Sequence, residues 1–175
     1  LKILDDAGTE LPANTPGLIY IHQPATPDFS YVGNEQARAS MEVRGLKTMG
    51  DIGYLDEEGF LFIVDRKADM VISGGVNIYP VETELALQGM PGVADCAVFG
   101  IPDDEFGEAL AAAVQPAPGA TLTEEGVRAW LRERIAGYKV PKVVTFHTEL
   151  PREDTGKIFK RKLREPYWAG RARRV

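Results

Sequence analysis

A lysine near the C-terminal end of the chain is the first residue with a possible chemical role. Lys157 follows Gly156 in the segment 150–164, which is rich in Lys and Arg. A Gly-Lys pair invites comparison with the phosphate-binding loop, which needs a Gly five residues before the second Gly and Ser or Thr after the Lys. Those places hold Pro151 and Ile158. The pattern instead predicts a lysine after a turn, at the start of a basic helix. Taken alone, it is more typical of a solvated helix start.

A carboxylate next to a glycine is the second candidate. Asp51 follows Gly50 in Thr-Met-Gly-Asp-Ile-Gly-Tyr. A glycine lets the backbone turn sharply and lets another molecule approach closely. A carboxylate at such a turn can accept two hydrogen bonds from a sugar diol, as it does for the ribose in dinucleotide sites. Taken alone, the same pattern is more typical of an ordinary turn aspartate.

The third candidate segment combines an arginine with a small-residue loop. Arg66 could bind a ribose or a phosphate with its planar guanidinium. Downstream, Ser73, Gly74 and Gly75 precede Val-Asn-Ile-Tyr-Pro-Val-Glu. Two glycines either let the backbone come close to a ligand or simply form a tight turn. The segment by itself favours the plain turn.

Composition narrows the classes of function. The net charge of −6 gives no reason to expect nonspecific binding to nucleic acid. The single cysteine, Cys96, cannot form an internal disulfide, and its apolar neighbours indicate a small buried side chain. No apolar run reaches the roughly 18 residues that a membrane span requires. We therefore expect a cytoplasmic protein with no membrane span. Because the sequence starts at Leu1 without an initiator Met, we also expect it to be part of a longer chain.

The first part of the chain reads as short strands and turns. Strands are predicted at 2–4 and 17–21, and a hairpin at 51–64 whose turn is Asp-Glu-Glu-Gly. A short helix is possible over 34–42. This half has few apolar residues for a core of its own, so we expect it to pack against other chain.

The pattern changes after Arg66 to alternating strands and helices. Strands are predicted at 70–72, 93–100, 109–114 and 143–146, and helices at 80–87, 123–135 and 157–164. Thr123 is expected to cap the second helix and Gly137 to end it. This order predicts a compact α+β unit, with a boundary near residues 65–69.

Taken together and in order, these segments resemble the acyl-adenylate-forming superfamily of acyl-CoA synthetases, carrier-loading adenylation domains and beetle luciferase. The resemblance rests on Gly-Asp at 50–51, Asp-Arg at 65–66, Ser-Gly-Gly-Val-Asn-Ile-Tyr-Pro-Val-Glu at 73–82 and Leu-Pro-Arg-x-x-x-Gly-Lys-Ile at 150–158. Two bridging segments, 100–108 and 138–142, add weight. The resemblance covers nearly the whole chain, and four weak motifs in register are a strong signal.

The resemblance implies a fold and a reaction. Residues 1–65 would end a large N-terminal domain and include strands of its β-barrel subdomain. Residues 66–175 would form the mobile C-terminal lid domain, an α+β unit with a mixed sheet and helices. The family activates a carboxylic acid with Mg²⁺-bound ATP to an acyl-adenylate, and then transfers the acyl group to coenzyme A. Its partners would be the acid, coenzyme A and the N-terminal domain of the same enzyme.

Site roles follow residue by residue from the resemblance. Lys157 matches the catalytic lysine, Asp51 the ribose-binding aspartate and Arg66 the nucleotide-binding arginine. Ser73, Gly74 and Gly75 match the loop that lies beside the pantetheine thiol, and no residue matches a metal ligand. Ala68 stands at the hinge position, where the family commonly has Asp or Lys. Met49 stands where the family usually has Thr, which removes a hydroxyl near the nucleotide.

Three functions stay open at this stage. The sequence of the 73–82 segment resembles the branch of the family that uses coenzyme A, and so favours a ligase of this kind. The alternatives are an enzyme that loads a separate carrier protein, and a non-catalytic module that resembles the lid. The phosphate loop and the acyl pocket would lie in the N-terminal domain, so this chain alone is expected to be inactive.

Overall fold

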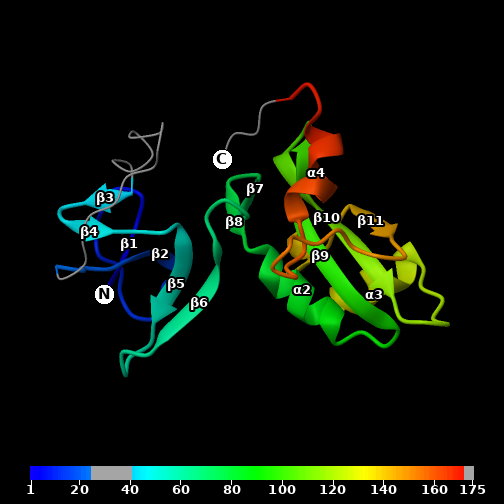
Figure 1. Ribbon diagram of the computed structural model, residues 1–175, viewed down its shortest axis with the longest axis horizontal. Coiled ribbons are helices and arrows are strands. Elements are labelled where there is room, and N and C mark those ends of the chain that lie inside the picture. The colour runs from blue at the N-terminus through cyan, green and yellow to red at the C-terminus, as the bar shows by residue number, and fades with distance from the viewer. Residues whose placement is uncertain (25–40, 172–175) are drawn as a thin grey trace. The chain divides into compact units, whose positions relative to one another are not determined.

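The computed structural model describes residues 1–24 and 41–171, and these form two compact units. The first unit is Leu1–Ala68 and the second is Asp69–Val175. The units therefore meet three residues after the predicted end of the first domain at residue 65. Figure 1 shows the strands and helices of each unit along the chain. Within the described residues, no helix has the length and apolar character needed to cross a bilayer.

The first unit is built on antiparallel strands. Four of them form a sheet in the order β1-β2-β5-β6, and two shorter strands form a separate ribbon. The six are β1 (Lys2–Leu4), β2 (Gly17–Tyr20), β3 (Glu42–Val43), β4 (Leu46–Lys47), β5 (Asp51–Leu55) and β6 (Leu61–Arg66). Among the described residues this sheet is open, with β1 and β6 at its edges. Of the helix expected at 34–42, residues 34–40 lie outside the described residues, and Glu42 begins β3 instead.

The predicted hairpin of β5 and β6 is confirmed, and its turn follows from local chemistry. The Asp56 carboxylate accepts hydrogen bonds from the backbone N–H groups of Glu58, at 3.0 Å, and Phe60, at 2.8 Å. Gly59 has φ +86°, a conformation that glycine adopts without steric cost. The turn aligns the two strands so that Asp51 pairs with Arg66 at the far end of the hairpin.

The second unit contains one mixed sheet and the helices. Strand β10 is central: β9 pairs along one side of it, and β11 and β7 pair on the other, with β8 beyond β7. The strands are β7 (Val71–Ser73), β8 (Val76–Ile78), β9 (Val93–Asp103), β10 (Gly107–Pro116) and β11 (Val143–Phe146). The helices are α2 (Pro80–Gln88), α3 (Glu124–Arg132), the 3₁₀ helix η1 (Gly137–Lys139) and α4 (Lys160–Trp168). The α+β prediction is confirmed.

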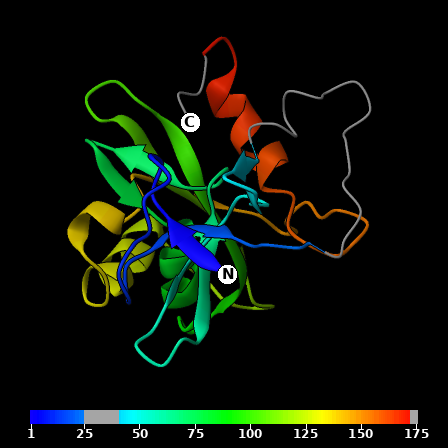
Figure 2. The same cartoon turned by 90° about the vertical axis from the view of Figure 1, so that its left-hand side faces the viewer.

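Alternate residues of β9 and β10 face two different cores. On one face, Val98 and Ala112 pack with Leu87 of α2 and Leu131 of α3. On the other face, Phe99 and Ala111 pack with Leu150 and with α4. Figure 2 shows α4, orange to red, on the side of the sheet opposite the yellow α3. Because both faces are covered, these strands carry near-continuous apolar runs rather than a polar alternation.

Two helices and one strand differ from the sequence prediction. Thr123 does cap α3, with its hydroxyl accepting from the Gly126 N–H at 3.1 Å, but the helix ends at Arg132 rather than at residue 135. Gly137, which was predicted to end this helix, instead begins η1. The final helix begins at Lys160, three residues later than predicted. The reason is a bridge between Arg152 and Ile158, which holds 152–158 as a turn. The strand β8 was not predicted, because no element was assigned between the turn at 73–75 and the helix expected from residue 80.

Cys96 is buried in the first of these cores, as the sequence predicts. Burial above all, and then the nearby carboxylates of Glu84 and Asp95, raise the pKa of its thiol to about 12. The thiolate is the reactive form of cysteine, so this side chain should be inert at neutral pH.

We therefore expect iodoacetamide to label Cys96 much more slowly in the native chain than in the chain unfolded in urea, at pH 8. Peptide mass spectrometry of timed samples would measure both rates. Equal rates in the two states would contradict the burial of this thiol.

Candidate functional site

Asp51 and Arg66 lie together at the open end of the β5–β6 hairpin. The Arg66 Nε is 3.3 Å from the Asp51 Oδ1, and the two residues are direct cross-strand partners. The Arg66 side chain is 66% exposed and that of Asp51 is 36% exposed. Exposed pairs of this kind contribute little to stability, so either partner can exchange the contact for a ligand at small cost. Together they offer an acceptor for a diol beside a cationic donor.

The turn before Asp51 uses a threonine, although not at the position where the family has one. Thr48 is buried, and its hydroxyl accepts a hydrogen bond from the Gly50 N–H at 3.1 Å. Gly50 has φ +84°, and its carbonyl accepts from the Lys67 N–H at 2.8 Å. Met49 is exposed. The missing threonine at position 49 therefore leaves the turn itself intact, and the hydroxyl of Thr48 shapes the backbone that presents Asp51.

Ala68 is the last residue of the first unit. It is exposed and lies in the turn of residues 67–69 that follows β6. Asp69, the first residue of the second unit, pairs with Arg164 of α4 at 3.4 Å. The predicted hinge position thus coincides with the junction between the two units.

Gly74 and Gly75 form the two-residue connection of a β-hairpin. Ser73 of β7 pairs with Val76 of β8, and the glycines between them have φ +57° and +81°. Two positive φ values define a type I′ turn, the tightest common hairpin connection, for which Gly-Gly is well suited. The plain-turn interpretation and the close-approach interpretation therefore describe one structure, an exposed backbone tip without side chains.

A second loop supports this tip from behind. The Gly74 N–H donates to the Phe106 carbonyl at 2.9 Å. Asp103 accepts from the Phe106 N–H at 2.9 Å and pairs with the Lys142 ammonium at 2.6 Å. The Lys142 ammonium and the Phe106 N–H hold the pKa of the Asp103 carboxyl below its usual range. The support is consequently present at neutral pH and is lost only as the pH falls through that lowered pKa.

Lys157 stands on a separate tight turn. The Glu153 N–H donates to the Lys157 carbonyl at 2.8 Å, and the Gly156 N–H donates to the Glu153 carbonyl at 2.8 Å. Gly156 has φ +85°. The turn closes at the bridge between Arg152 and Ile158. Lys157 is thus placed on a closed loop ahead of α4, not on the helix where the sequence analysis put it.

The ammonium of Lys157 has no carboxylate partner among the described residues, and the same is true of Lys162, whereas three other basic neighbours are paired. Arg152 pairs with Asp95, Lys160 with Glu84 and Arg161 with Glu165. Lys157 itself is exposed. A cation on a rigid turn with no internal partner is available for a negative charge that comes from outside the unit.

Other basic residues that could meet the phosphates of coenzyme A are already paired. Lys139 contacts Glu82 at 2.5 Å, Lys142 contacts Asp103, and Arg161 contacts Glu165 at 2.7 Å. Burial would lower the pKa of Lys139, but the hydrogen bond and the charge of Glu82 outweigh it and raise that pKa. No site for the coenzyme phosphates is therefore assigned to these three side chains.

Of the predicted site residues, the structure pairs Asp51 with Arg66 in the first unit and places the tip at 73–75 and Lys157 on two separate loops of the second unit. Sequence reasoning missed the support: Thr48 below Asp51, and Arg152 beside Lys157. Arg152 was visible in the Leu-Pro-Arg motif, but its partner is distant in sequence. Within the described ranges, no group of three or more His, Cys, Asp or Glu side chains could hold a metal ion.

Comparison with known proteins identifies the family that shares this fold and these loops. Residues 82–157 match the AMP-binding enzyme C-terminal domain family. The chain is 41% identical to feruloyl-CoA synthase from Amycolatopsis sp. over 95% of this chain and 34% of that protein. It is 38% identical to the fatty acid–[acyl-carrier-protein] ligase ScoC of Streptomyces coeruleorubidus, over 99% of this chain and 33% of that one.

A solved structure agrees with these relatives. ATP-bound MatB from Rhodopseudomonas palustris superimposes with a TM-score of 0.87 at 37% identity, over 95% of this chain and 33% of MatB. The chain spans about a third of the length of the curated relatives it matches. It belongs to the acyl-adenylate-forming superfamily and contains that family's C-terminal domain.

The glycine hairpin makes a prediction about stability. Gly75→Ala should lower the free energy of unfolding by about 1–2 kcal/mol, because a side chain is strained at positive φ. Gly74→Ala should cost more, because its Cβ would also lie 3.1 Å from the Phe106 ring. Gly137→Ala is the matched control, since it meets no neighbour and has no positive φ. Urea unfolding of the three variants measures the order, and a Gly137 variant as unstable as the others would contradict it.

Proposed function

We propose that the chain is the C-terminal part of an AMP-forming acid–CoA ligase. The observation that carries the proposal is the exposed Lys157 ammonium, which is held on a closed turn and has no carboxylate partner among the described residues. The family match, which extends from residue 82 to residue 157, supports it. So does the similarity to feruloyl-CoA synthase and to the ATP-bound MatB structure. The substrates would be a carboxylic acid, Mg²⁺-bound ATP and coenzyme A.

In the first half-reaction the acid carboxylate attacks the α-phosphorus of ATP, and pyrophosphate leaves. Negative charge grows on the phosphoryl oxygens and on the leaving group. The Lys157 ammonium would stabilise that charge more in the transition state than in the ground state, which accelerates the step. Asp51 would accept hydrogen bonds from the ribose hydroxyls, and Arg66 would donate to the ribose or to a phosphate.

In the second half-reaction the thiol of coenzyme A attacks the acyl carbon, and AMP leaves. The tip formed by Ser73, Gly74 and Gly75 would lie beside the pantetheine arm, where the lack of side chains allows the thiol to pass. The same lid would serve both steps if it turned about Ala68 at the junction of the two units. A small residue can absorb such a change of φ and ψ.

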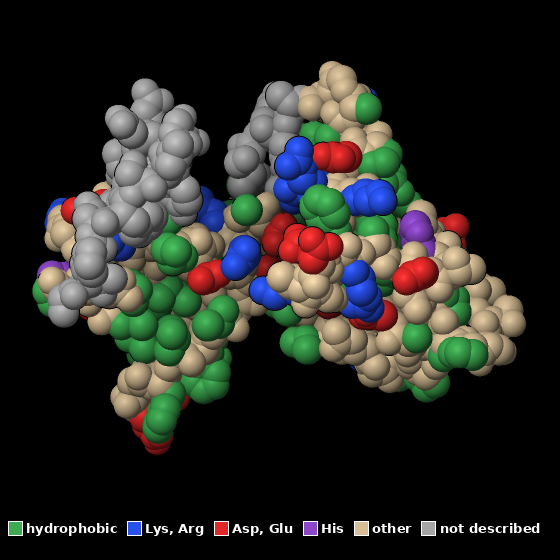
Figure 3. All heavy atoms as spheres, in the orientation of Figure 1, with side chains coloured by type: hydrophobic (Ala, Val, Ile, Leu, Met, Phe, Trp, Pro, Cys, Tyr) green, Lys and Arg blue, Asp and Glu red, His purple; other side chains and the backbone are tan. Residues whose placement is uncertain are grey.

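The first unit would pack against the remainder of a longer enzyme. Phe60, Leu61, Phe62 and Ile63 are all exposed, on and next to the edge strand β6. Figure 3 shows hydrophobic side chains gathered over this hairpin. Successive residues point to opposite faces of a strand, so four consecutive apolar residues expose apolar surface on both faces. This favours a domain fragment over a freestanding lid-like module.

A second function has one observation in its favour. The similarity to ScoC, whose acceptor is an acyl carrier protein, supports an enzyme that loads a carrier rather than coenzyme A. The two differ in the acceptor alone. Consumption of coenzyme A in the absence of any carrier protein would exclude carrier loading as the sole activity.

Lys157→Ala in the full-length enzyme should reduce acid-dependent pyrophosphate release by about 10²–10³-fold, the usual loss for one such donor. The same variant should still convert supplied acyl-AMP and coenzyme A to the thioester. Lys162→Ala is the control, because Lys162 is an exposed lysine of the adjacent α4. Adenylation by the Lys157 variant at the wild-type rate would refute the assigned role.

The 175-residue chain alone should form no acyl-adenylate from ATP and any acid, because the phosphate loop and the acyl pocket would lie elsewhere in the enzyme. Incubation with α-labelled ATP and a panel of carboxylic acids tests this. Turnover above that of a heat-denatured sample would show that the chain carries a complete site.

A further inference from the structure

Arg152 ties the lysine turn to the core sheet. Its Nη1 donates to the Gly156 carbonyl at 2.8 Å, which lies directly before Lys157. Its Nη2 donates to the Asp95 carboxylate of β9. The other oxygen of Asp95 accepts from the Cys96 N–H at 2.8 Å, so the carboxylate is itself fixed to the strand. One guanidinium therefore joins the turn to the most buried strand pair of the unit.

A second ion pair holds the other end of the segment. Lys160, the first residue of α4, contacts Glu84 of α2 at 2.8 Å, and both side chains are largely buried at 21% and 13% exposure. Glu84 also accepts from the Val98 N–H of β9 at 2.7 Å. Residues 153–159 are thus clamped on both sides to the region around β9. The Lys157 side chain extends from this clamp, exposed and with no carboxylate partner among the residues that the structure describes.

We infer that Arg152 is a positioning residue for Lys157, acting through its simultaneous contacts with Gly156 and Asp95. This inference rests on the proposed function, because it concerns the same lysine. A lysine side chain is long and flexible, so the position of its ammonium group is better defined when its backbone is held firmly. Arg152 holds Gly156, the residue before Lys157, and its planar guanidinium donates to two acceptors at once.

The test uses the full-length enzyme with Arg152→Gln and, separately, Asp95→Asn. Each removes the charge pair while keeping a polar side chain of similar size. We expect kcat for adenylation to fall by about 10–100-fold, the scale of loss from a displacement of about 1 Å. The KM for ATP and the rate of thioester formation from supplied acyl-AMP should stay at the wild-type values, because neither depends on the placement of Lys157.

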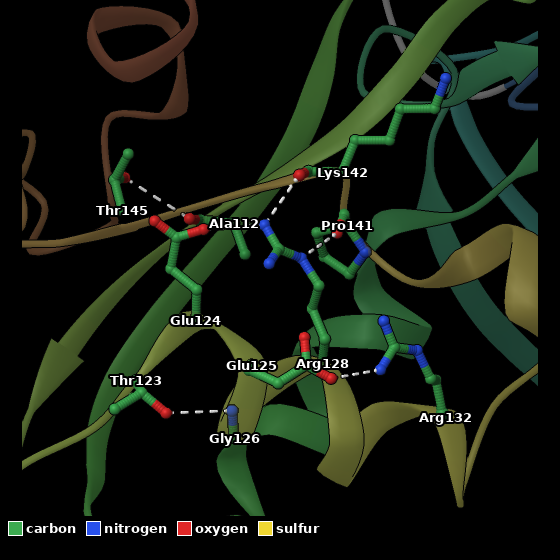
Figure 4. A network of polar contacts seen from close by, with 10 residues as sticks. All are labelled: Ala112, Thr123, Glu124, Glu125, Gly126, Arg128, Arg132, Pro141, Lys142 and Thr145. Atoms are coloured by element: carbon green, nitrogen blue, oxygen red, sulfur yellow. Dashed lines mark hydrogen bonds and ion pairs between the residues drawn. The ribbon is translucent and has the colours of Figure 1, made fainter.

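Arg128 provides the matched control. It also joins a carboxylate to backbone carbonyls, contacting Glu124 at 2.8 Å, the Lys142 carbonyl at 2.9 Å and the Pro141 carbonyl at 3.3 Å (Figure 4). It staples α3 to the segment before β11, on the face of the sheet opposite α4. Arg128→Gln should lower thermal stability without a selective loss of adenylation.

The double variant distinguishes one clamp from two independent effects. If Arg152 and Asp95 act as a pair, the double variant should lose no more adenylation than the worse single variant. Additive losses would overturn the inference. So would an equal loss in both half-reactions that tracks the melting temperature, as expected for Arg128→Gln, since Arg152 would then be structural only.

Lys157→Ala, measured in the same series, separates this inference from the proposed function. If that variant loses adenylation while the Arg152 and Asp95 variants keep it, positioning by Arg152 is refuted and the ligase proposal stands. If Lys157→Ala adenylates normally, the proposed function itself fails.

Discussion

The long antiparallel pairing of β9 with β10 is the constraint on which the second unit depends. Both strands are buried on both faces, and β10 contains Ala-rich sequence from Ala109 to Ala113. Small side chains on a two-sided sheet let helices approach closely from either side. The helices α2 and α3 cover one face, while α4 and Leu150 cover the other. Because this pair is rigid, every loop anchored to it is held in a defined place.

The candidate functional residues stand on such loops rather than on the regular elements. The Gly74–Gly75 tip is held by the backbone of Phe106, which belongs to the turn between β9 and β10. The Lys157 turn is held through Asp95, near the opposite end of β9. Both loops are exposed, as loops that carry function usually are, and both take their order from the strands beneath them. Polar contacts near the two ends of β9 thus hold both exposed loops against the apolar core.

Several of the charged side chains near these loops form ion pairs within their own unit. Among the described basic residues near the lysine turn, Arg152, Lys160 and Arg161 are neutralised by acids of the same unit. Lys157 is exposed and has no acidic partner among the described residues. In the first unit, Asp51 and Arg66 form an ion pair with one another across the hairpin. The pairs differ in exposure: the side chains of Lys160 and Glu84 are 21% and 13% exposed, whereas those of Arg66 and Asp51 are 66% and 36% exposed.

Local sequence determined much of this protein. The hairpin at 51–64 follows from an Asp-Glu-Glu-Gly turn between apolar runs, and the Thr123 cap follows from hydroxyl chemistry at a helix start. The order of the motifs was sufficient to identify the family. The local sequence did not determine the position of Lys157, because its turn is held by Arg152, whose acidic partner Asp95 is 57 residues away. The helix α3 was predicted to end too late and α4 to begin too early. Helix propensity alone does not show where tertiary contacts end a helix. Patterns of a few residues record short-range geometry, whereas an ion pair between distant segments exists only once the sheet has brought them together.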